Sequence, residues 1–338
     1  MDPDWAYLPA LHLSLILDKL VERLDHIWFS AVCKNWHSIA KLNHQNNEFK
    51  SKVLPMLMIP TERKSRKKRS LYGIAAKKVY HFQLPVPYSK RCCGSSHGWL
   101  ATVDSCYVIT LMNPFKNVAP IPLPPLNPGL SHKYLFEQNM HKVTLSVDPT
   151  SNPDDYVVAA VYTQACNLAF IKAGQKFWTY IDEDFLCFTD ITFYKGAYLV
   201  KSLEGNLLMV RRFLGYHHPD SSSYSTGTES FEVYKLELDV QSGKLLQMSK
   251  LNSLGDNVLF LGDSDSISVS ASYFSHCLRK DSIYYSDDFY DNDPYPFGPF
   301  DNGIYNVKDR SFAKYYPYNP SFKRMPPPLW VLQPFKWD

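Results

Sequence analysis

The 338-residue sequence predicts an α+β protein that is mostly β, with a small helical segment near its N-terminal end. Aromatic residues make up 15% of the chain, including 23 Tyr and 20 Phe, and such side chains suit half-buried, pleated surfaces. The 24 prolines occur in clusters that would interrupt helices but suit turns and strand ends. Helical periodicity is confined to the first 45 residues, and short strands separated by turns are predicted from residue 53 onward.

Two stretches near the start have the spacing of amphipathic helices. From Ala10 to Leu20, apolar residues recur at i, i+3, i+4 and i+7, and a second stretch runs from Asp25 to Leu42 without Pro or Gly. Chains shorter than about 40 residues seldom bury enough surface to be stable alone. We therefore expect the apolar side of these helices to be covered, either by the rest of the chain or by another protein.

Roughly eighteen short strands are predicted, many at the 8–12-residue spacing of all-β folds. The first, Val53–Ile59, contains Pro55 and precedes Pro60, so we expect an edge strand at most. His97–Val103 and Tyr107–Met112 are expected to form a hairpin. The other predicted strands are Leu71–Ala76, Val79–Leu84, Lys142–Val147, Tyr156–Tyr162, Leu168–Lys172, Phe177–Ile181, Ile191–Tyr194, Ala197–Ser202, Leu207–Phe213, Phe231–Leu238, Lys244–Lys250, Val258–Leu261, Ser266–Ala271, Ser282–Ser286 and Gly303–Asn306. This many strands without a long helix favours a kelch-like β-propeller over a sandwich.

Charge and cysteine content argue against several classes of protein. Although the net charge is +3, six basic residues lie in one run, and without them 30 of the 36 Lys and Arg remain against 33 Asp and Glu. A nucleic-acid surface normally spreads positive charge over a whole face, so no nucleic-acid partner is expected. The seven cysteines include no Cys-x-x-Cys pair, which argues against a disulfide framework or a structural zinc site. We expect no signal peptide, no membrane partner, and a location in the nucleus, the cytoplasm or both.

The basic run has two interpretations. It is a nuclear-localisation patch, or it is the charged tip of a hairpin between two early strands. The basic residues of the run are Arg63, Lys64, Arg66, Lys67, Lys68 and Arg69.

The start of the chain resembles an F-box. The resemblance depends on the Leu8-Pro9 pair and on the later pattern Phe29-x-x-Val32-Cys33-Lys34-x-Trp36, although Trp28 and His37 stand where basic residues are common. F-boxes dock a Skp-type linker subunit, which joins them to a cullin. The residues to which the resemblance assigns this docking are Leu8, Pro9, Leu15, Ile16, Leu20, Val32 and Trp36. The alternatives are that these helices pack on the β domain, or that the F-box is degenerate.

The rest of the chain resembles a plant F-box family whose C-terminal half is the KIB-type β-propeller. Among the segments that carry this resemblance are Cys92–Leu100, Leu111–Phe115, Asp190–Gly196, Phe231–Leu236, Leu259–Asp263 and Asp281–Asp288. The domains implied are an F-box (1–45), a linker with the first strand and the basic loop (46–70), the propeller (71–312), and a Pro- and aromatic-rich segment packing on it (313–338).

The family resemblance implies a non-enzymatic substrate-recognition adaptor of an SCF-type (Skp–cullin–F-box) ubiquitin ligase, without a cofactor. The propeller would bind an unidentified target protein through two polar segments, 217–228 and 287–300, since loops on a rigid scaffold commonly carry binding. Ordinary solvated loops are the alternative interpretation of either segment. The candidate target-binding residues are Tyr216, His217, His218, Tyr224, Phe289, Tyr290 and Tyr295.

Catalytic and metal-binding interpretations find little support in the sequence. Gly94-Ser95-Ser96-His97-Gly98 spells the nucleophile elbow of α/β-hydrolases, but a strand follows it where that motif needs a helix. Acidic pairs such as Asp154-Asp155 are typical of solvated turns rather than of a glycosidase, the least favoured alternative. Cys92 and Cys93 would point to opposite faces of a strand, so they are poorly placed to share a metal. We therefore expect no catalytic residue and no metal site.

Overall fold

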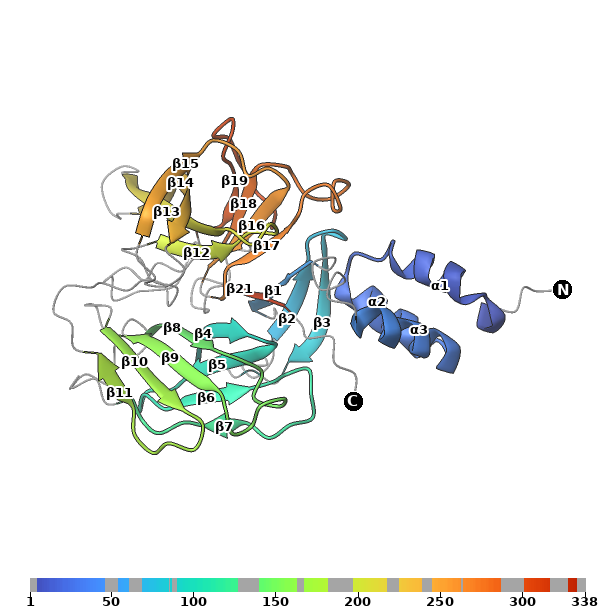
Figure 1. Ribbon diagram of the computed structural model, residues 1–338, viewed down its shortest axis with the longest axis horizontal. Coiled ribbons are helices and arrows are strands. Elements are labelled where there is room, and N and C mark those ends of the chain that lie inside the picture. The colour runs from blue at the N-terminus through green and yellow to red at the C-terminus, as the bar shows by residue number, and fades with distance from the viewer. Residues whose placement is uncertain are drawn as a thin grey trace.

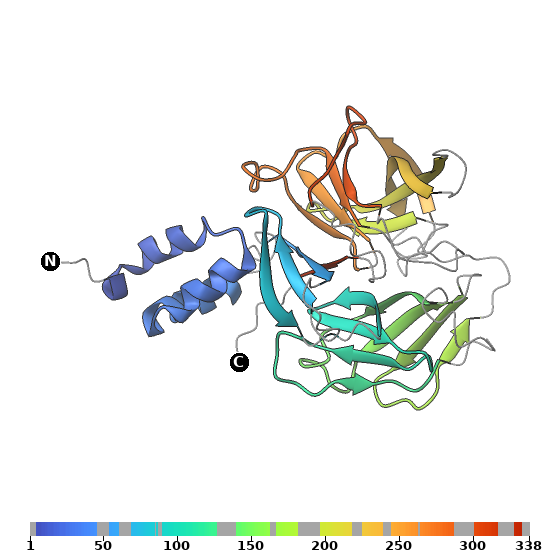
Figure 2. The ribbon, with the colours of Figure 1, turned by 180° about the vertical axis from the view of Figure 1, so that it is seen from behind.

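The computed structural model describes residues 5–45, 54–60, 69–84, 86, 90–126, 140–162, 167–181, 197–217, 225–238, 245–262, 264–286, 301–316 and 328–332. These residues form N-terminal helices and five β-sheets, which are the blades of a propeller (Figure 1). The helices stand at one side of the propeller, and the N-terminal end points away from it (Figures 1 and 2). No helix in the described ranges is both long and apolar enough to cross a bilayer.

The N-terminal helices are short and pack around a small apolar core of their own. They are η1 (Trp5–Tyr7), α1 (Ala10–Leu17), α2 (Arg23–Ala31) and α3 (Lys34–Gln45). The buried residues of this helical core are Leu13, Leu17, Phe29 and Ala40. Two expectations are corrected: α1 ends before Leu20, and the second stretch is two helices rather than one. The turn at Val32–Cys33 brings the Phe29 and Trp36 ring centroids to 4.5 Å, whereas one continuous helix would separate them by about 10 Å along its axis.

The five blades follow the chain in order, except that the last strand joins the first blade. Blade 1 consists of β21 (Leu329–Val331), β1 (Met56–Pro60), β2 (Arg69–Gly73) and β3 (Lys78–Leu84). Blade 2 consists of β4 (Arg91–Ser96), β5 (Trp99–Val103), β6 (Ile109–Met112) and β7 (Ile121–Pro122). Blade 3 consists of β8 (Met140–Leu145), β9 (Val157–Tyr162), β10 (Asn167–Lys172) and β11 (Thr179–Ile181).

The last two blades depart from this plan in different ways. Blade 4 consists of β12 (Ala197–Lys201), β13 (Leu207–His217), β14 (Ser225–Leu238) and β15 (Leu245–Leu251). Its strands β13 and β14 have 11 and 14 residues and are longer than the other strands of the propeller. Blade 5 has the order β17 (Ile267–Ser270), β16 (Asn257–Leu261), β18 (Ser282–Tyr285), β19 (Gly303–Asn306) and β20 (Phe312–Ala313), and β16 pairs with β18 in parallel.

The ring is closed by the antiparallel pairing of β21 with β1. Leu57 lies opposite Trp330, whose side chain is completely buried. The Trp330 indole N–H donates to the Leu261 carbonyl at 3.0 Å, and its ring contacts those of Phe260 and Tyr315 with centroids 5.0 and 5.3 Å away. The C-terminal strand thus completes blade 1 and packs against blade 5.

Apolar clusters between blades form the core of the propeller. One joins blades 1 and 2, a second joins blades 2 and 3, a third joins blades 4 and 5, and a fourth joins blades 5 and 1. Each blade therefore buries a face against a neighbour, which explains why strands such as β5 and β16 are buried at every position.

The first strand differs from the expectation of an edge strand. β1 lies between β21 and β2 and is paired on both sides. Pro55 precedes the strand and Pro60 is its last residue, so neither missing N–H group interrupts the ladder. The pairing also extends the first blade beyond the expected range 71–312 at both ends, to Met56 on one side and Val331 on the other.

Other strands were missed or predicted too short. β4, β7, β20 and β21 lie outside the predicted strands, and the expected loop 217–228 is shorter because β14 begins at Ser225. The β13–β14 ladder continues past a bulge at Phe213–Leu214, so that His217 still pairs with Ser225. The expected strand Ile191–Tyr194 lies outside the described residues.

Ring closure generates the first testable prediction. Trp330→Ala removes a fully buried indole and its bond to Leu261, so we expect a loss of about 3–5 kcal/mol in the free energy of unfolding, measured by urea denaturation. Leu332→Ala is the control, because Leu332 lies two residues after Trp330 and its side chain is exposed. This variant should lower the free energy of unfolding by less than about 1 kcal/mol. Equal stability of the two variants would contradict the closure described above.

Candidate functional site

The helical segment exposes an unusual amount of apolar surface. We call the following residues the helical apolar surface: Trp5, Tyr7, Leu11, Leu15, Val32 and Leu42. Their exposed fractions range from 54% for Val32 to 83% for Tyr7. Isolated exposed apolar side chains are common in proteins, but this number within residues 5–45 makes the helical segment a candidate interaction surface.

Polar contacts hold the first turn of the chain against the start of α3. The Trp36 indole N–H donates to the Trp5 carbonyl at 3.0 Å, and the Asn35 amide donates to the Ala6 carbonyl at 3.1 Å. At the other end of α3, the Asn43 amide donates to Ser14 Oγ at 3.2 Å. These bonds fix η1 and α1 alongside α3, so the helical apolar surface is carried by an ordered scaffold.

The residues predicted to dock a linker divide into two groups. Pro9, Leu15 and Val32 are exposed. The remaining predicted residues are partly buried and pack on the helical core: Leu8, Ile16, Leu20 and Trp36. Four further exposed apolar residues were not among the predicted docking residues: Trp5, Tyr7, Leu11 and Leu42. Leu11 could have been predicted from the sequence, because it lies four positions before the candidate Leu15 and so on the same face of α1.

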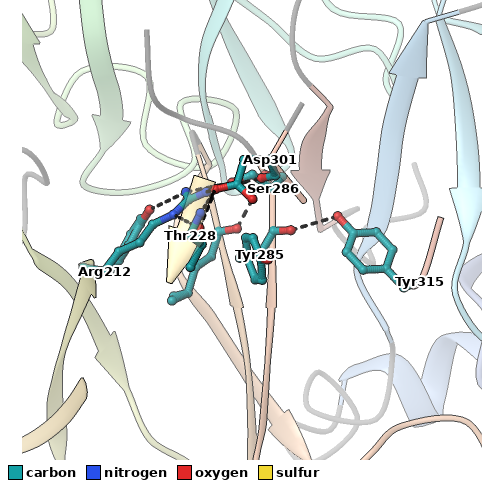
Figure 3. A network of polar contacts seen from close by, with 8 residues as sticks. Arg212, Thr228, Tyr285, Ser286, Asp301 and Tyr315 are labelled. Atoms are coloured by element: carbon teal, nitrogen blue, oxygen red, sulfur yellow. Dashed lines mark hydrogen bonds and ion pairs between the residues drawn. The ribbon is translucent and has the colours of Figure 1, made fainter. Parts of the chain in front are cut away.

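On the propeller, Arg212 is the centre of a polar network (Figure 3). Its Nη2 donates to Asp301 Oδ2 at 2.9 Å and its Nε to Thr228 Oγ1 at 2.8 Å. Nη1 donates to the Ser286 carbonyl at 3.2 Å, and the guanidinium lies 5.0 Å from the centroid of the Tyr285 ring. With only 6% of its side chain exposed, Arg212 has exchanged water for these partners.

This network anchors both segments predicted to bind a target. Ser286 and Asp301 are the described residues on either side of 287–300, and Arg212 bonds to both. Thr228, on the strand that follows residues 218–224, donates its backbone N–H to Asp301 Oδ2 at 2.6 Å. Thr228, Ser286 and Asp301, which are described residues at or beside the ends of the two candidate segments, are therefore held together where blade 4 meets blade 5.

The individual target-binding residues are placed only in part. Tyr216 and His217 are the last residues of β13. The remaining five lie outside the described residues: His218, Tyr224, Phe289, Tyr290 and Tyr295. Sequence reasoning also missed Arg212 and Asp301, which lie 89 positions apart and so give no local pattern.

The basic run connects β1 to β2, because Pro60 pairs with Arg69 across it. This agrees with the interpretation as a hairpin connection. Arg69 is the first residue of β2 and is 1% exposed, so its side chain does not contribute to an exposed basic patch. Arg63, Lys64, Arg66, Lys67 and Lys68 lie outside the described residues.

The Gly-x-Ser-x-Gly string forms a β-hairpin and not a nucleophile elbow. Gly94–Ser96 belong to β4, His97 and Gly98 form the turn with φ of 52° and 80°, and Trp99 begins β5. Cys92 packs between blades 1 and 2 and Cys93 between blades 2 and 3, on opposite faces as expected. Within the described ranges, no three His, Cys, Asp or Glu side chains are grouped as a metal site requires.

Comparison with known proteins identifies the propeller. A family model described as KIB1-4 beta-propeller matches residues 71–198 and 195–306. No curated protein matches the chain. Among solved structures, the crystal structure of the N-terminal domain of Nup159 aligns at 9% identity with a TM-score of 0.23, over 80% of this chain and 64% of that chain. So low a TM-score does not indicate a shared fold, and the propeller assignment depends on the sheet topology and the family match.

The Arg212 network generates the second prediction. Arg212→Ala leaves the partly buried Asp301 carboxylate without its cation, so we expect a loss of about 3 kcal/mol in the free energy of unfolding, measured by urea denaturation. Arg211→Ala is the matched control, because the neighbouring Arg211 is exposed and lies 5.2 Å from the Phe213 ring centroid. It should cost about 1 kcal/mol or less. A loss for Arg212→Ala as small as for this control would show that the network does not hold the two segments.

Proposed function

The chain belongs to the KIB1-4 β-propeller family, and we propose that it is the substrate-recognition adaptor of an SCF-type ubiquitin ligase. In this proposal the helical segment docks a Skp-type linker subunit, and the propeller binds the target protein. Such propellers are protein-interaction scaffolds, which suggests a non-catalytic role for this one. The adaptor would act by proximity, raising the effective concentration of target lysines near a charged conjugating enzyme.

The observation that carries the proposal is the helical apolar surface. The helices bury their own small core, yet Leu15 and Val32, two of the residues that the F-box resemblance assigns to linker docking, remain 55% and 54% exposed. Fully burying an exposed Val or Leu side chain contributes about 1.5–3 kcal/mol, so covering the exposed half of each of these two contributes roughly half of that. A helical partner surface is the usual way to cover an amphipathic helix pair.

Charge around this surface indicates the chemistry of the partner. Lys19, Lys34 and Lys41 are exposed, whereas in residues 5–45 the carboxylates of Asp18, Glu22 and Asp25 are buried or half-buried. Exposed lysines on the same helical segment as the apolar residues fit a partner that carries acidic residues beside an apolar groove, and such complementarity mainly raises the association rate. We therefore infer that the linker presents carboxylates around its docking groove.

Trp28 does not weaken this proposal. It occupies a position where F-boxes commonly have a basic residue, but its ring lies 6.2 Å from that of Tyr80 on β3. Trp28 thus contacts blade 1, although 52% of it remains exposed. The substitution adds an aromatic contact between the helices and the propeller and removes none of the residues of the helical apolar surface.

For target binding, we propose the side of the propeller on which the Arg212 network lies. The network joins Thr228, which follows 218–224 on β14, to Ser286 and Asp301, the described residues on either side of 287–300, and loops on a rigid scaffold commonly carry recognition. A location in the nucleus, the cytoplasm or both follows from the ligase role and remains part of the proposal.

A propeller scaffold with a silent F-box is the alternative function. It is favoured by Leu8, Ile16, Leu20 and Trp36, which pack on the helical core instead of standing free for a partner. Binding of the linker by purified protein separates the two functions, because a silent F-box would not bind it.

Linker docking generates the third prediction. The double variant Leu15→Asp and Val32→Asp places two charges on the proposed interface, so we expect its affinity for a Skp-type linker to fall at least about 100-fold, measured by calorimetry or pull-down. Because both side chains are exposed, circular dichroism and the unfolding midpoint should be unchanged. Leu246→Asp on β15, at a side chain that is 69% exposed, is the control and should bind normally. Undiminished binding by the double variant would rule out this docking surface.

A further inference from the structure

The helices are joined to the propeller by contacts with two different blades. The Tyr273 hydroxyl of blade 5 donates to the Asp18 carbonyl at 2.7 Å, and the Leu54 N–H before β1 donates to the Val21 carbonyl at 3.4 Å. Val21 packs on the apolar cluster between blades 5 and 1, and Ile27 packs on the cluster between blades 1 and 2. The loop between α1 and α2 is thus held from two sides, which restricts rotation as well as separation.

Glu22 lies at the centre of this junction. It is only 4% exposed, and its Oε1 accepts the backbone N–H of Ala76, in the turn between β2 and β3, at 2.9 Å. Gly73 on β2 makes room for the carboxylate: a Cβ at that position would lie 2.1 Å from Glu22 Oε2. An acidic side chain from the helical segment therefore fits into blade 1 at a position where blade 1 has no side chain.

The electrostatics of the junction agree with this burial. Burial raises the pKa of the Glu22 carboxyl, and this effect outweighs the hydrogen bonds from Ala76 and Tyr80, which lower it. Burial and the nearby Glu22 also raise the pKa of Tyr80, and they raise that of the Cys277 thiol to about 11. The negative charge of Glu22 is thus felt by one group of blade 1 and one of blade 5, and burial disfavours the charged form of all three groups.

We propose that Glu22 is a positioning residue that locks the helical segment onto blade 1 in one orientation. Through this lock, the linker-docking surface and the target-binding side of the propeller keep a constant separation and angle. For its effect on ubiquitin transfer this inference rests on the function proposed above. A loosened junction would leave both binding activities intact and change only which lysines reach the conjugating enzyme.

Four variants of the full chain test the lock. Glu22→Ala removes the acceptor for the Ala76 N–H. Gly73→Ala is a change in blade 1 that displaces the same Glu22 carboxylate, because the new Cβ would occupy its place. Glu22→Gln keeps an acceptor oxygen and removes the charge, so it is the conservative control. Because Glu22 precedes α2 and makes no side-chain capping bond to it, its replacement does not remove a helix cap. In the double variant, Gly73→Ala should add little to Glu22→Ala, since the two act on one contact.

The first measurement is hydrogen exchange of the Ala76 amide and small-angle scattering of each variant. We expect Ala76 to lose protection, and the scattering to show a broader range of shapes, in Glu22→Ala and Gly73→Ala but not in Glu22→Gln. The unfolding midpoint of the blades should stay within a few degrees of that of the unchanged chain. Full protection of Ala76 in both loosened variants would overturn the lock.

The second measurement is self-ubiquitylation of the chain in a complex reconstituted with linker, cullin and charged conjugating enzyme, mapped by mass spectrometry. The unchanged chain should be modified at a restricted set of propeller lysines, and the loosened variants at additional ones, with linker affinity unchanged. An identical pattern in all variants would overturn the positioning role. Failure of the unchanged chain to bind the linker would instead overturn the proposed function, and the exchange and scattering results would still decide whether the lock exists.

Discussion

The pairing of β21 with β1 is the contact on which the rest of the molecule depends. It brings residues 329–331 back to the first blade and places Trp330 in the apolar cluster between blades 5 and 1. The same cluster includes Tyr72 beneath the β2–β3 turn, and Val21 and Tyr273 of the helical junction pack against it. Ring closure and attachment of the helices therefore share one core. If the ring opened, Tyr273 would be carried away from Asp18 together with blade 5, and the junction would lose one of its two supports.

This shared core gives the proposed adaptor a simple geometry. The helical apolar surface projects from blade 1, whereas the Arg212 network joins β13 and β14 of blade 4 to Ser286 and Asp301 of blade 5. Apolar clusters connect blade 4 to blade 5 and blade 5 to blade 1. The chain of contacts from one proposed binding surface to the other is therefore short and close-packed, and close-packed interiors transmit displacement with little loss.

Much of this arrangement was predictable from local pattern, and the failures have physical reasons. Short apolar and aromatic runs bounded by turn residues located most strands, because strands that are buried on both faces have such runs. β21 was missed because its partner β1 lies some 270 positions earlier, and no local pattern reports such a pairing. β4 was missed because Cys92-Cys93-Gly94-Ser95-Ser96 lacks β-branched and aromatic residues, although all of β4 is buried.

The candidate site shows the same limit of local pattern. Helical periodicity correctly placed Leu13 and Leu17 on the face of α1 that fills the helical core. It gave no sign of whether Leu11 and Leu15, which lie on another face, would be covered or left exposed. Which apolar residues a helix keeps for itself depends on the helices beside it. Arg69 was misjudged for a related reason: within a run of basic residues it resembles its neighbours, but it is the first residue of a buried strand.

Buried polar contacts in this protein occur where orientation has to be set. Asp265, in the connection between β16 and β17, accepts hydrogen bonds from Ser96 on β4 and Thr144 on β8, and so joins three blades. Arg212 joins blades 4 and 5, and Glu22 joins the helices to blade 1. Apolar surfaces tolerate sliding and repacking, whereas a buried polar group that loses its hydrogen-bond partner costs about 1–3 kcal/mol, so each of these contacts selects one arrangement over its near neighbours. An adaptor that acts by holding two proteins at a set distance needs this selectivity at its joints more than it needs additional stability.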